Sequence, residues 1–250
     1  PLSERLCPIK QRRTDKCIRC EPCHIMNGFG GAGTLSDGKY NITTQFGGEL
    51  HTAVGVDTAL ELMEYVDSVL CSCGGAEARL YSTVAGDLKT KALRNNLYLL
   101  DAKVRHLGTD RNMKILQHMY DYICEKVEIR FSVSAEDIER LPEGGFIVHT
   151  DQGGALRCRD LLLTGGRSGS RWIAGICDKF GIATKSNRVD IGLRVELPAE
   201  VFKEITDEVY ESKIVYKTEK YNDMVRTFCM NPHGEVVSEN TNGIVTVNGH

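Results

Sequence analysis

Several features are missing from the sequence, and each absence excludes a class of protein. No apolar run approaches the roughly 20 residues that a membrane helix needs, so no membrane span is expected. A net charge of -3 provides no basic field to hold a nucleic acid backbone, so nucleic acid is not an expected partner. Internal repeats and low-complexity segments are also missing. The single basic run is short and is predicted to lie in a solvated loop: Lys10, Arg12, Arg13 and Lys16.

The two ends also lack features of a natural start and stop. PLSERLCPIK has no initiator Met and no apolar region like that of a signal peptide, and IVTVNGH stops within a strand-like run. We therefore expect the chain to be an internal part of a longer protein.

Cysteine is abundant, and its distribution favours a reducing compartment. The chain has ten cysteines, but at 250 residues it can bury a large core and does not depend on disulfides. Cys124, Cys158 and Cys177 fall in apolar periodic segments, where a thiol behaves as a small buried hydrophobic group. We expect a soluble, cytoplasmic protein.

Helical periodicity occurs in the middle of the chain. Asp57 or Thr58 can cap a helix that ends near Gly74, and apolar side chains recur on one face of it. The same reasoning predicts helices over 109–126 and 168–180, and a short helix that begins near Pro198.

Strand-like runs alternate with these helices. VEIRFSV at 127–133 follows a helix almost directly, and this order is typical of α/β proteins. FIVHT and ALRCRDLLLTGG predict a hairpin whose second arm continues into a buried strand over 161–163. Residues 1–50 predict ordered loop. From about residue 185 the chain is mainly β, with five strand-like runs: VDIGLRVEL, KIVYKT, MVRTFCM, EVVSE and IVTVNG.

GFGGAG matches the pattern G-x-G-x-x-G at Gly28, Gly30 and Gly33. A dinucleotide-binding turn needs a strand before the glycines, a helix after them and an acidic residue about 20 positions later. This sequence lacks all three, so the match is not a Rossmann fingerprint. Two interpretations remain open: a loop whose backbone N–H groups approach a phosphate or a flavin, or an ordered surface loop.

Cys17, Cys20 and Cys23 precede these glycines with the spacing C-x2-C-x2-C. The spacing suits three ligands of an iron–sulfur cluster, but Asn27 occupies the position of the fourth. A zinc site would need further ligands, for which Cys7 and His24 are the candidates. The alternative is a group of thiols close to a redox cofactor.

Five motifs carry a resemblance to a known family. In chain order they are GFGGAGTLSDGKYNIT, RHLGTDRNMKILQHMYDY, LLLTGGRSGS, VDIGLRVELPAEV and RTFCMNPHGEVV. Together they cover essentially the whole chain, which resembles bacterial and archaeal FAD-dependent dehydrogenases described as NAD(P)/FAD-dependent oxidoreductases.

The resemblance implies an α/β flavoprotein of the glutathione reductase type, in which a substrate domain interrupts a Rossmann-type FAD domain. Residues 1–184 would be a partial FAD-binding domain that lacks its first βαβ unit, and 185–250 the start of a mainly β substrate domain. The true nucleotide fingerprint and a C-terminal Gly-Asp segment would lie outside the chain. The isolated chain is therefore expected to bind FAD weakly or not at all, and to be inactive.

The resemblance also implies cofactor-binding residues. Arg5 corresponds to a basic residue that approaches the FAD phosphate or ribose, and Val133 to a position whose backbone pairs with adenine. Thr164, Gly165 and Gly166 correspond to a turn beneath the cofactor. The loop that would lie against the flavin and pyrophosphate contributes the largest set: Gly30, Gly31, Gly33, Ser36, Asp37, Gly38 and Lys39.

His106 is the candidate catalytic residue, because it precedes a helix cap and lies among charged residues that could tune its protonation. His233 and Cys229 are the alternatives. The predicted function is hydride transfer between FAD and an unknown small-molecule substrate, with NAD(P)H as candidate electron donor. Two other hypotheses remain: a metal-binding or redox-sensing module built on the cysteines, and a non-catalytic remnant that binds a partner through an open sheet edge.

Overall fold

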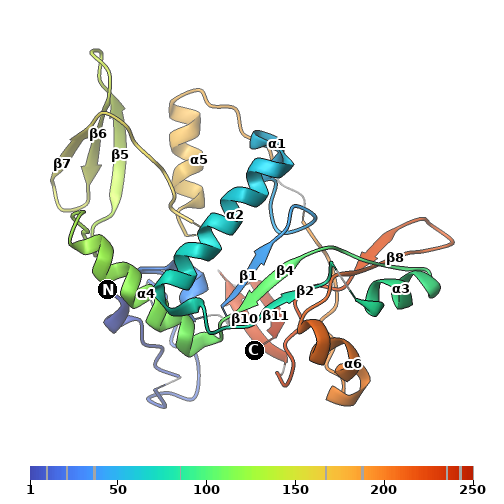
Figure 1. Ribbon diagram of the computed structural model, residues 1–250. Helices are drawn as coiled ribbons and strands as arrows, with labels where there is room; N and C mark the ends of the chain where they lie inside the picture. The colour runs from blue at the N-terminus through green and yellow to red at the C-terminus, as the bar shows by residue number, and fades with distance from the viewer. Residues whose placement is uncertain are drawn as a thin grey trace. The chain divides into compact units, whose positions relative to one another are not determined.

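The computed structural model describes residues 1–9, 11–20, 22–35, 38–84, 86–166, 168–186, 189–234, 236–241 and 244–249. In these residues the protein is mixed α/β, with short helices and small antiparallel sheets (Figure 1). The chain forms two compact units, each built from two stretches: Pro1–Ala32 with Tyr120–Asp190, and Gly33–Met119 with Ile191–His250. The predicted domains, 1–184 and 185–250, divide the chain differently and remain a prediction.

The first unit contains a three-stranded meander and a helix. Strand order is β5-β6-β7, and β6 and β7 form the predicted hairpin, with Phe146 opposite Cys158. Gly145 makes the tight turn between β5 and β6 at φ +88°, where an added Cβ would lie 2.6 Å from the carbonyl oxygen of Cys158. The elements are β5 (Ala135–Arg140), β6 (Phe146–Thr150), β7 (Ala155–Cys158) and α5 (Ser170–Lys179).

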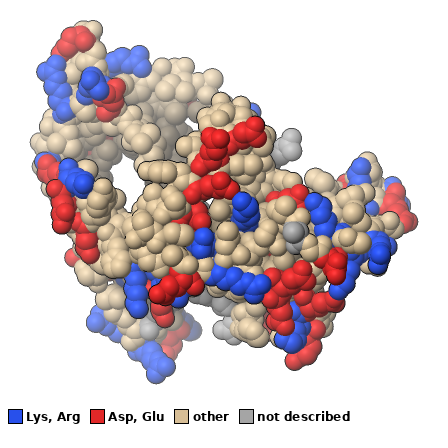
Figure 2. Space-filling view, in the orientation of Figure 1, with Lys and Arg blue, Asp and Glu red and all other residues tan. Residues whose placement is uncertain are grey.

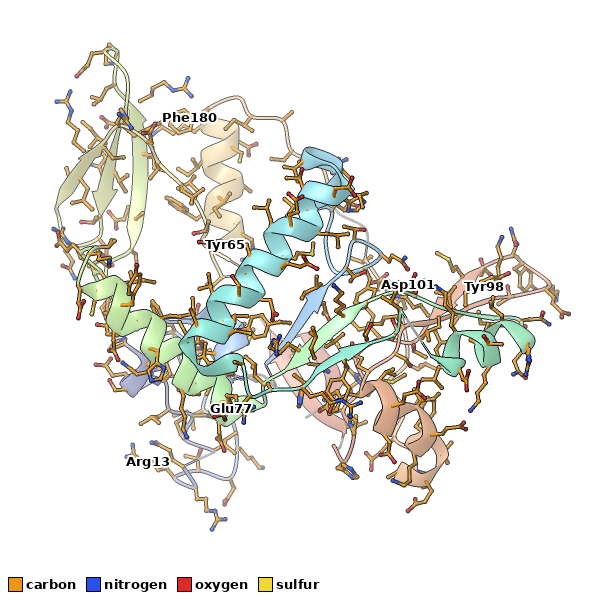
Figure 3. The ribbon with its side chains drawn as sticks, viewed as in Figure 1. Arg13, Tyr65, Glu77, Tyr98, Asp101 and Phe180 are labelled. Atoms are coloured by element: carbon orange, nitrogen blue, oxygen red, sulfur yellow. The ribbon has the colours of Figure 1, made fainter. Side chains whose placement is uncertain are left out.

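Two polar contacts join helix α5 to strand β5, in which Ile138 is buried. Trp172 donates a hydrogen bond from Nε1 to the carbonyl oxygen of Glu136, at 2.8 Å, and the ammonium of Lys179 lies 2.6 Å from the Asp137 carboxylate. Phe180, labelled in Figure 3, directly follows the helix. The guanidinium of Arg140, at the end of β5, lies over its ring, 5.3 Å from the ring centroid. The helix predicted over 168–180 from its apolar periodicity is confirmed as α5.

One sheet of the second unit has the order β1-β4-β2, and helix α2 packs against it. Leu70, Leu107 and Ile115 form its apolar core. Arg105 pairs with Asp67 through two hydrogen bonds of 2.6 and 2.8 Å, which join the sheet to α2. The elements are β1 (Lys39–Ile42), α1 (Leu50–Val54), α2 (Val56–Leu70), β2 (Leu80–Ser82), β4 (Lys103–His106) and α4 (Thr109–Cys124), whose last turns belong to the first unit.

A second sheet of this unit has the order β3-β8-β9, and β10 pairs with β11. Leu88, Leu99 and Val209 form a separate small core beneath it. Asp101, labelled in Figure 3, accepts hydrogen bonds of 2.6 and 2.9 Å from Lys89. The elements are α3 (Asp87–Arg94), β3 (Leu97–Leu99), α6 (Ala199–Val209), β8 (Ile214–Lys217), β9 (Met224–Arg226), β10 (Val236–Thr241) and β11 (Ile244–Gly249).

Three predicted strands are wrong. Residues 127–133 and 161–163 form no ladder, and the nearest strand to the first of them begins at Ala135. The segment 189–197 alternates apolar and polar residues as a strand does, yet it pairs with no strand in the described residues, and Ile191 is 96% exposed. Local pattern fits a strand in each case, but a strand forms only where a neighbour accepts its hydrogen bonds.

Every strand pairing among the described residues is antiparallel, so no parallel sheet is seen in that part of the chain. Cys124 is exposed, which corrects its predicted burial, while Cys158 and Cys177 are half-buried. None of the described helices has the length and apolar character to cross a membrane. On the face shown in Figure 2, basic and acidic side chains are interspersed.

Candidate functional site

Arg5 is the buried centre of the cysteine- and glycine-rich loop of the first unit. Its side chain arises from the short helical turn at the N-terminus and is 4% exposed. Burial lowers the pKa of the guanidinium, and the nearby Cys23 sulfur acts in the opposite direction. The guanidinium donates four hydrogen bonds to backbone carbonyls: His24 at 3.0 Å, Phe29 at 2.9 Å, Gly31 at 2.7 Å, and Ile25.

The glycines of this loop are needed to wrap it around Arg5. Gly28 adopts φ +111°, and a Cβ there would lie 3.1 Å from Cδ of Arg5. Gly30 and Gly31 also have positive φ values of 78° and 61°. These conformations are easily available only to glycine. The G-x-G-x-x-G match therefore results from a loop folded on a guanidinium, and the predicted contact of Arg5 with a phosphate stays a prediction.

Gly31 differs from Gly28 in the space that an added Cβ would enter. A Cβ added at Gly31 would meet no atom within 4 Å. The backbone at this position is thus open on one side, although the loop beneath it is held by Arg5. An open glycine on a fixed loop is a suitable surface for a cofactor to lie against.

In the second unit, Asn112 holds the next part of the loop. It is fully buried on α4, and its amide donates to the carbonyl oxygens of Gly33 at 2.9 Å and Thr34 at 3.1 Å. Its amide oxygen accepts a hydrogen bond of 2.9 Å from the hydroxyl of Tyr40. Gly38, at φ +63°, packs so closely that a Cβ would lie 3.1 Å from that of Asn112. Ser36 and Asp37 lie outside the described residues.

Lys39 belongs to a buried ionic cluster with Glu211 and Lys213, whose side chains are 10%, 4% and 6% exposed. Lys39 Nζ donates to Glu211 at 2.7 Å, to the Met230 carbonyl at 3.0 Å and to Asn231 at 3.2 Å. Lys213 donates to Glu211 and to a backbone carbonyl.

Two cations surround one carboxylate in this cluster. Burial acts to raise the pKa of Glu211, but attraction to Lys39 and the hydrogen bonds from both lysines outweigh it, so the pKa is lowered. The ammonium of Lys39 is thus already engaged within the protein, and its predicted contact with a pyrophosphate stays a prediction.

His106 lies directly beside Lys39 across the β1–β4 ladder. Its ring stacks on Tyr210 with a centroid separation of 4.0 Å and an interplanar angle of 25°. It is half-buried. Two of the predicted site residues are therefore brought together in the second unit. His233 and Cys229, the alternatives to His106, are both exposed.

A second glycine-rich turn of the first unit directly precedes helix α5. Gly169 donates a backbone hydrogen bond of 3.2 Å to Gly165, and a Cβ on Gly169 would lie 2.9 Å from the Gly165 carbonyl oxygen. Gly166 adopts φ +62°, and a Cβ there would meet no atom within 4 Å. Thr164 is exposed at the start of this turn. Val133 is half-buried and outside any strand, contrary to the predicted strand.

The cysteines do not form a metal centre in the described part of the chain. No group of three His, Cys, Asp or Glu side chains is gathered there as a metal ion requires. Cys17 and Cys23 are exposed, Cys20 is half-buried, and all three are free thiols. The structure therefore does not bring together the three predicted ligands, nor add Cys7 and His24 to them.

The candidate residues are divided between the two units. Sequence reasoning missed Asn112 and Glu211; the first could have been found, because it is a polar residue in phase with Ile115 and Leu116 on the apolar face of a predicted helix. The first unit contains Arg5, Gly30, Gly31, Val133, Thr164, Gly165 and Gly166, and the second contains Gly33, Gly38, Lys39 and His106.

These features define a mixed α/β protein with two glycine-rich turns in one unit and a buried ionic cluster in the other. Comparison with models of known protein families finds no match to the chain, and none of the curated proteins matches it.

Proposed function

We propose that this chain is part of an FAD-dependent oxidoreductase that transfers hydride between the flavin and a small-molecule substrate, with NAD(P)H as electron donor. The proposal is supported by the five motifs in their order along the chain. It extends to the fold: the first unit would be the later part of a Rossmann-type FAD-binding domain. The hairpin, glycine turn and helix α5 follow one another in that unit in the order that the resemblance implies.

Several glycines of the first unit are open in this sense, and the observation that carries the proposal is that two of them, Gly31 and Gly166, lie in the two predicted cofactor-binding turns. Both have positive φ and nothing within 4 Å of an added Cβ. Phosphate oxygens and a flavin edge can approach such backbone closely because no side chain intervenes. The backbone of these two glycines therefore fits a bound FAD. The side chains of Arg5 and Lys39 contribute less to the fit, because both cations are already hydrogen-bonded within the protein.

When bound, FAD would supply the hydride chemistry, and the protein would bind and orient it. The Arg5 hydrogen bonds fix the loop that carries Gly31, so that this surface is formed before a cofactor arrives. His106 is our candidate to hold or accept a substrate proton, because an imidazole can do both near neutral pH. Its stacking on Tyr210 fixes the plane of the ring.

A titration with FAD tests the proposal through matched variants. Gly31→Asn and Gly166→Asn keep the left-handed backbone, which Asn tolerates, but fill the open space. Gly153→Asn is the control, since Gly153 also has positive φ and nothing within 4 Å of an added Cβ, but lies in the β6–β7 turn. Flavin fluorescence should report weak, saturable binding that the first two variants reduce at least about tenfold, or about 1.4 kcal/mol.

Two results would count against the proposal. One is saturable binding of FAD whose affinity Gly31→Asn and Gly166→Asn leave unchanged. The other is an equal loss of affinity in Gly31→Asn, Gly166→Asn and Gly153→Asn, which would indicate general destabilisation. Circular dichroism of each variant gives the fraction folded, and anaerobic addition of NADH or NADPH then shows which donor bleaches the bound flavin.

A further inference from the structure

Helix α2 of the second unit presents apolar side chains to solvent as well as to its sheet. Ala59 and Leu70 are buried, and Leu70 belongs to the apolar core of that sheet. On another side of the helix, Leu62 and Val66 lie one turn apart and are 44% and 51% exposed, and Tyr65, labelled in Figure 3, is 66% exposed. Solvent-facing positions of a helix are ordinarily polar, so this second apolar stripe indicates a surface that another molecule covers.

A groove lies beside this stripe, between α2, the preceding helix α1 and strand β1. Its volume is about 170 Å³. Ile42 and Leu70 line it and are buried, whereas Leu50, Leu62 and Val66 line it and are exposed. An apolar cavity of about 150 Å³ is large enough to hold a benzene ring. The groove, which we call the α2 groove, can therefore receive one large apolar side chain.

The chain around the α2 groove is acidic. Residues 40–78 contain neither Lys nor Arg. Glu64 and Asp67 are neutralised by basic residues of strand β4. Asp57 and Glu61 are exposed on α2, and neither forms an ion pair with any residue that the structure describes. The same stretch has six acidic residues in all: Glu49, Asp57, Glu61, Glu64, Asp67 and Glu77.

This charge decides between the possible occupants of the α2 groove. A second copy of the chain would bring two acidic α2 helices together, and like charges across an interface repel. An anionic membrane surface is disfavoured for the same reason. An amphipathic helix with an apolar stripe flanked by Lys or Arg satisfies both properties of the surface, because its apolar side chains enter the groove while its cations approach the carboxylates.

We propose that the α2 groove binds a basic amphipathic helix of a partner protein. One large apolar side chain of that helix would lie between Leu50, Leu62 and Val66, and its Lys or Arg side chains would lie near Asp57 and Glu61. The inference does not depend on flavin binding, because none of the residues that line the groove belongs to the predicted cofactor-binding set.

Three labelled peptides of about 18 residues, or five helical turns, test the two properties separately. The first has Leu along one helical face and Lys on the others. The second is a scrambled sequence of the same composition without an apolar face, and the third has Glu in place of each Lys. By fluorescence anisotropy, the first should bind the whole chain at least about tenfold more tightly than the other two. No binding of the first peptide would overturn the proposal, as would equal affinity for the first and either of the others.

Substitutions of exposed apolar residues locate the binding site. Leu62→Gln and Val66→Gln should each weaken binding of the first peptide at least about fivefold, because each removes apolar contact area from the groove. Leu93→Gln is the matched control, since Leu93 is 53% exposed on α3 and does not line the groove. Circular dichroism checks that all three variants are folded. An equal loss of affinity in the control, or no loss in the other two, would contradict the assignment.

A charge reversal tests the role of the carboxylates. Glu61→Lys should weaken binding of the first peptide and reduce the dependence of its affinity on salt, because one attraction becomes a repulsion. Glu200→Lys, an equal change at an exposed position of α6, is the control and should have a smaller effect. Equal effects of the two reversals would show attraction to the overall charge of the protein and would overturn the proposal.

Two measurements without peptide test the other occupants. Sedimentation velocity should show that the chain does not self-associate through this face, and flotation with phosphatidylglycerol vesicles should leave the chain unbound. Self-association that Leu62→Gln abolishes would assign the groove to a second copy of the chain. Vesicle binding that the same variant abolishes would assign it to a membrane. Either result would overturn the proposal.

Discussion

Replacing Glu211 by Gln should destabilise the second unit strongly. Glu211 is 4% exposed, and its carboxylate accepts hydrogen bonds from the ammonium groups of both Lys39 and Lys213. Gln has nearly the same shape but no charge, so the variant removes the negative charge that two buried cations share. Removing one partner of a buried ion pair costs about 3–5 kcal/mol, and the carbonyl acceptors of the two lysines offset only part of that loss.

Surface ion pairs provide the contrast. On α6, Lys203 Nζ lies 2.5 Å from Asp207 Oδ2, and both side chains are exposed. Asp207→Asn should leave the unfolding free energy unchanged within measurement error, because solvent screens such pairs. Urea unfolding, followed by circular dichroism, measures both variants. A loss below about 1 kcal/mol for Glu211→Gln would refute the reasoning that the cluster is desolvated and depends on its carboxylate.

The same cluster predicts a pH dependence. The pKa of Glu211 is lower in the folded protein than its ordinary value, so its contribution to stability is present above the unfolded pKa of about 4.3 and is lost as pH falls through the folded value. The difference in stability between the unchanged protein and Glu211→Gln should therefore shrink below about pH 4.3. A difference that stays constant down to about pH 3 would contradict the charged state assigned to Glu211.

Three further substitutions test other parts of the structure. Arg5→Lys keeps the charge but offers at most three N–H donors to four carbonyls, so backbone hydrogen exchange in the loop around it should accelerate; an unchanged rate would contradict its anchoring role. Asn112→Ala should cost about 3 kcal/mol in urea unfolding, since it removes three hydrogen bonds of a fully buried side chain, whereas Asn95→Ala, which removes one exposed hydrogen bond, should cost less than about 1 kcal/mol. Gly145→Ala should cost about 2–4 kcal/mol because its Cβ meets a carbonyl oxygen at 2.6 Å, against about 1 kcal/mol for Gly153→Ala, and similar losses at both would refute the steric argument.

Local pattern predicted helices α2, α4, α5 and α6 but missed α1 and α3. Helices α2, α4 and α5 lie within two residues of their predicted starts, because each apolar face is a pattern of nearby residues. The predicted cap of α2 at Asp57 or Thr58 is wrong, since Gly55 precedes that helix and Asp57 lies within it. The β6–β7 hairpin was predicted for the same reason, since its two arms are joined by a short glycine turn.

Long-range pairing could not be predicted in this way. Strand β4 pairs with β1 and β2, which lie far from it in the chain, and the strand-like run at 189–197 finds no such partner in the described residues. Nothing in the alternation of a single segment distinguishes these two outcomes, because the distinction depends on what other parts of the chain supply.

The candidate site shows the same division. Glycine at Gly28 and Gly31 could be predicted as a need for unusual backbone, but the reason for it, a guanidinium 23 to 26 residues earlier in the chain, could not. The sequence marked Arg5 and Lys39 as cations available to a cofactor. In the structure, Arg5 donates to backbone carbonyls and Lys39 to the distant Glu211, and no sequence motif predicts these acceptors.

The ionic cluster has a consequence for the order in which the protein is made. Lys39 and Glu211 are 172 residues apart, so at about 5–20 residues per second a ribosome synthesises Lys39 roughly 10 to 35 s before its counterion. The Arg5 loop is complete by Gly31, and the chain of the first unit by Asp190, before Glu211 exists. During synthesis the first unit can therefore fold early. The second unit cannot form its ionic cluster until the segment that contains Glu211 has been synthesised.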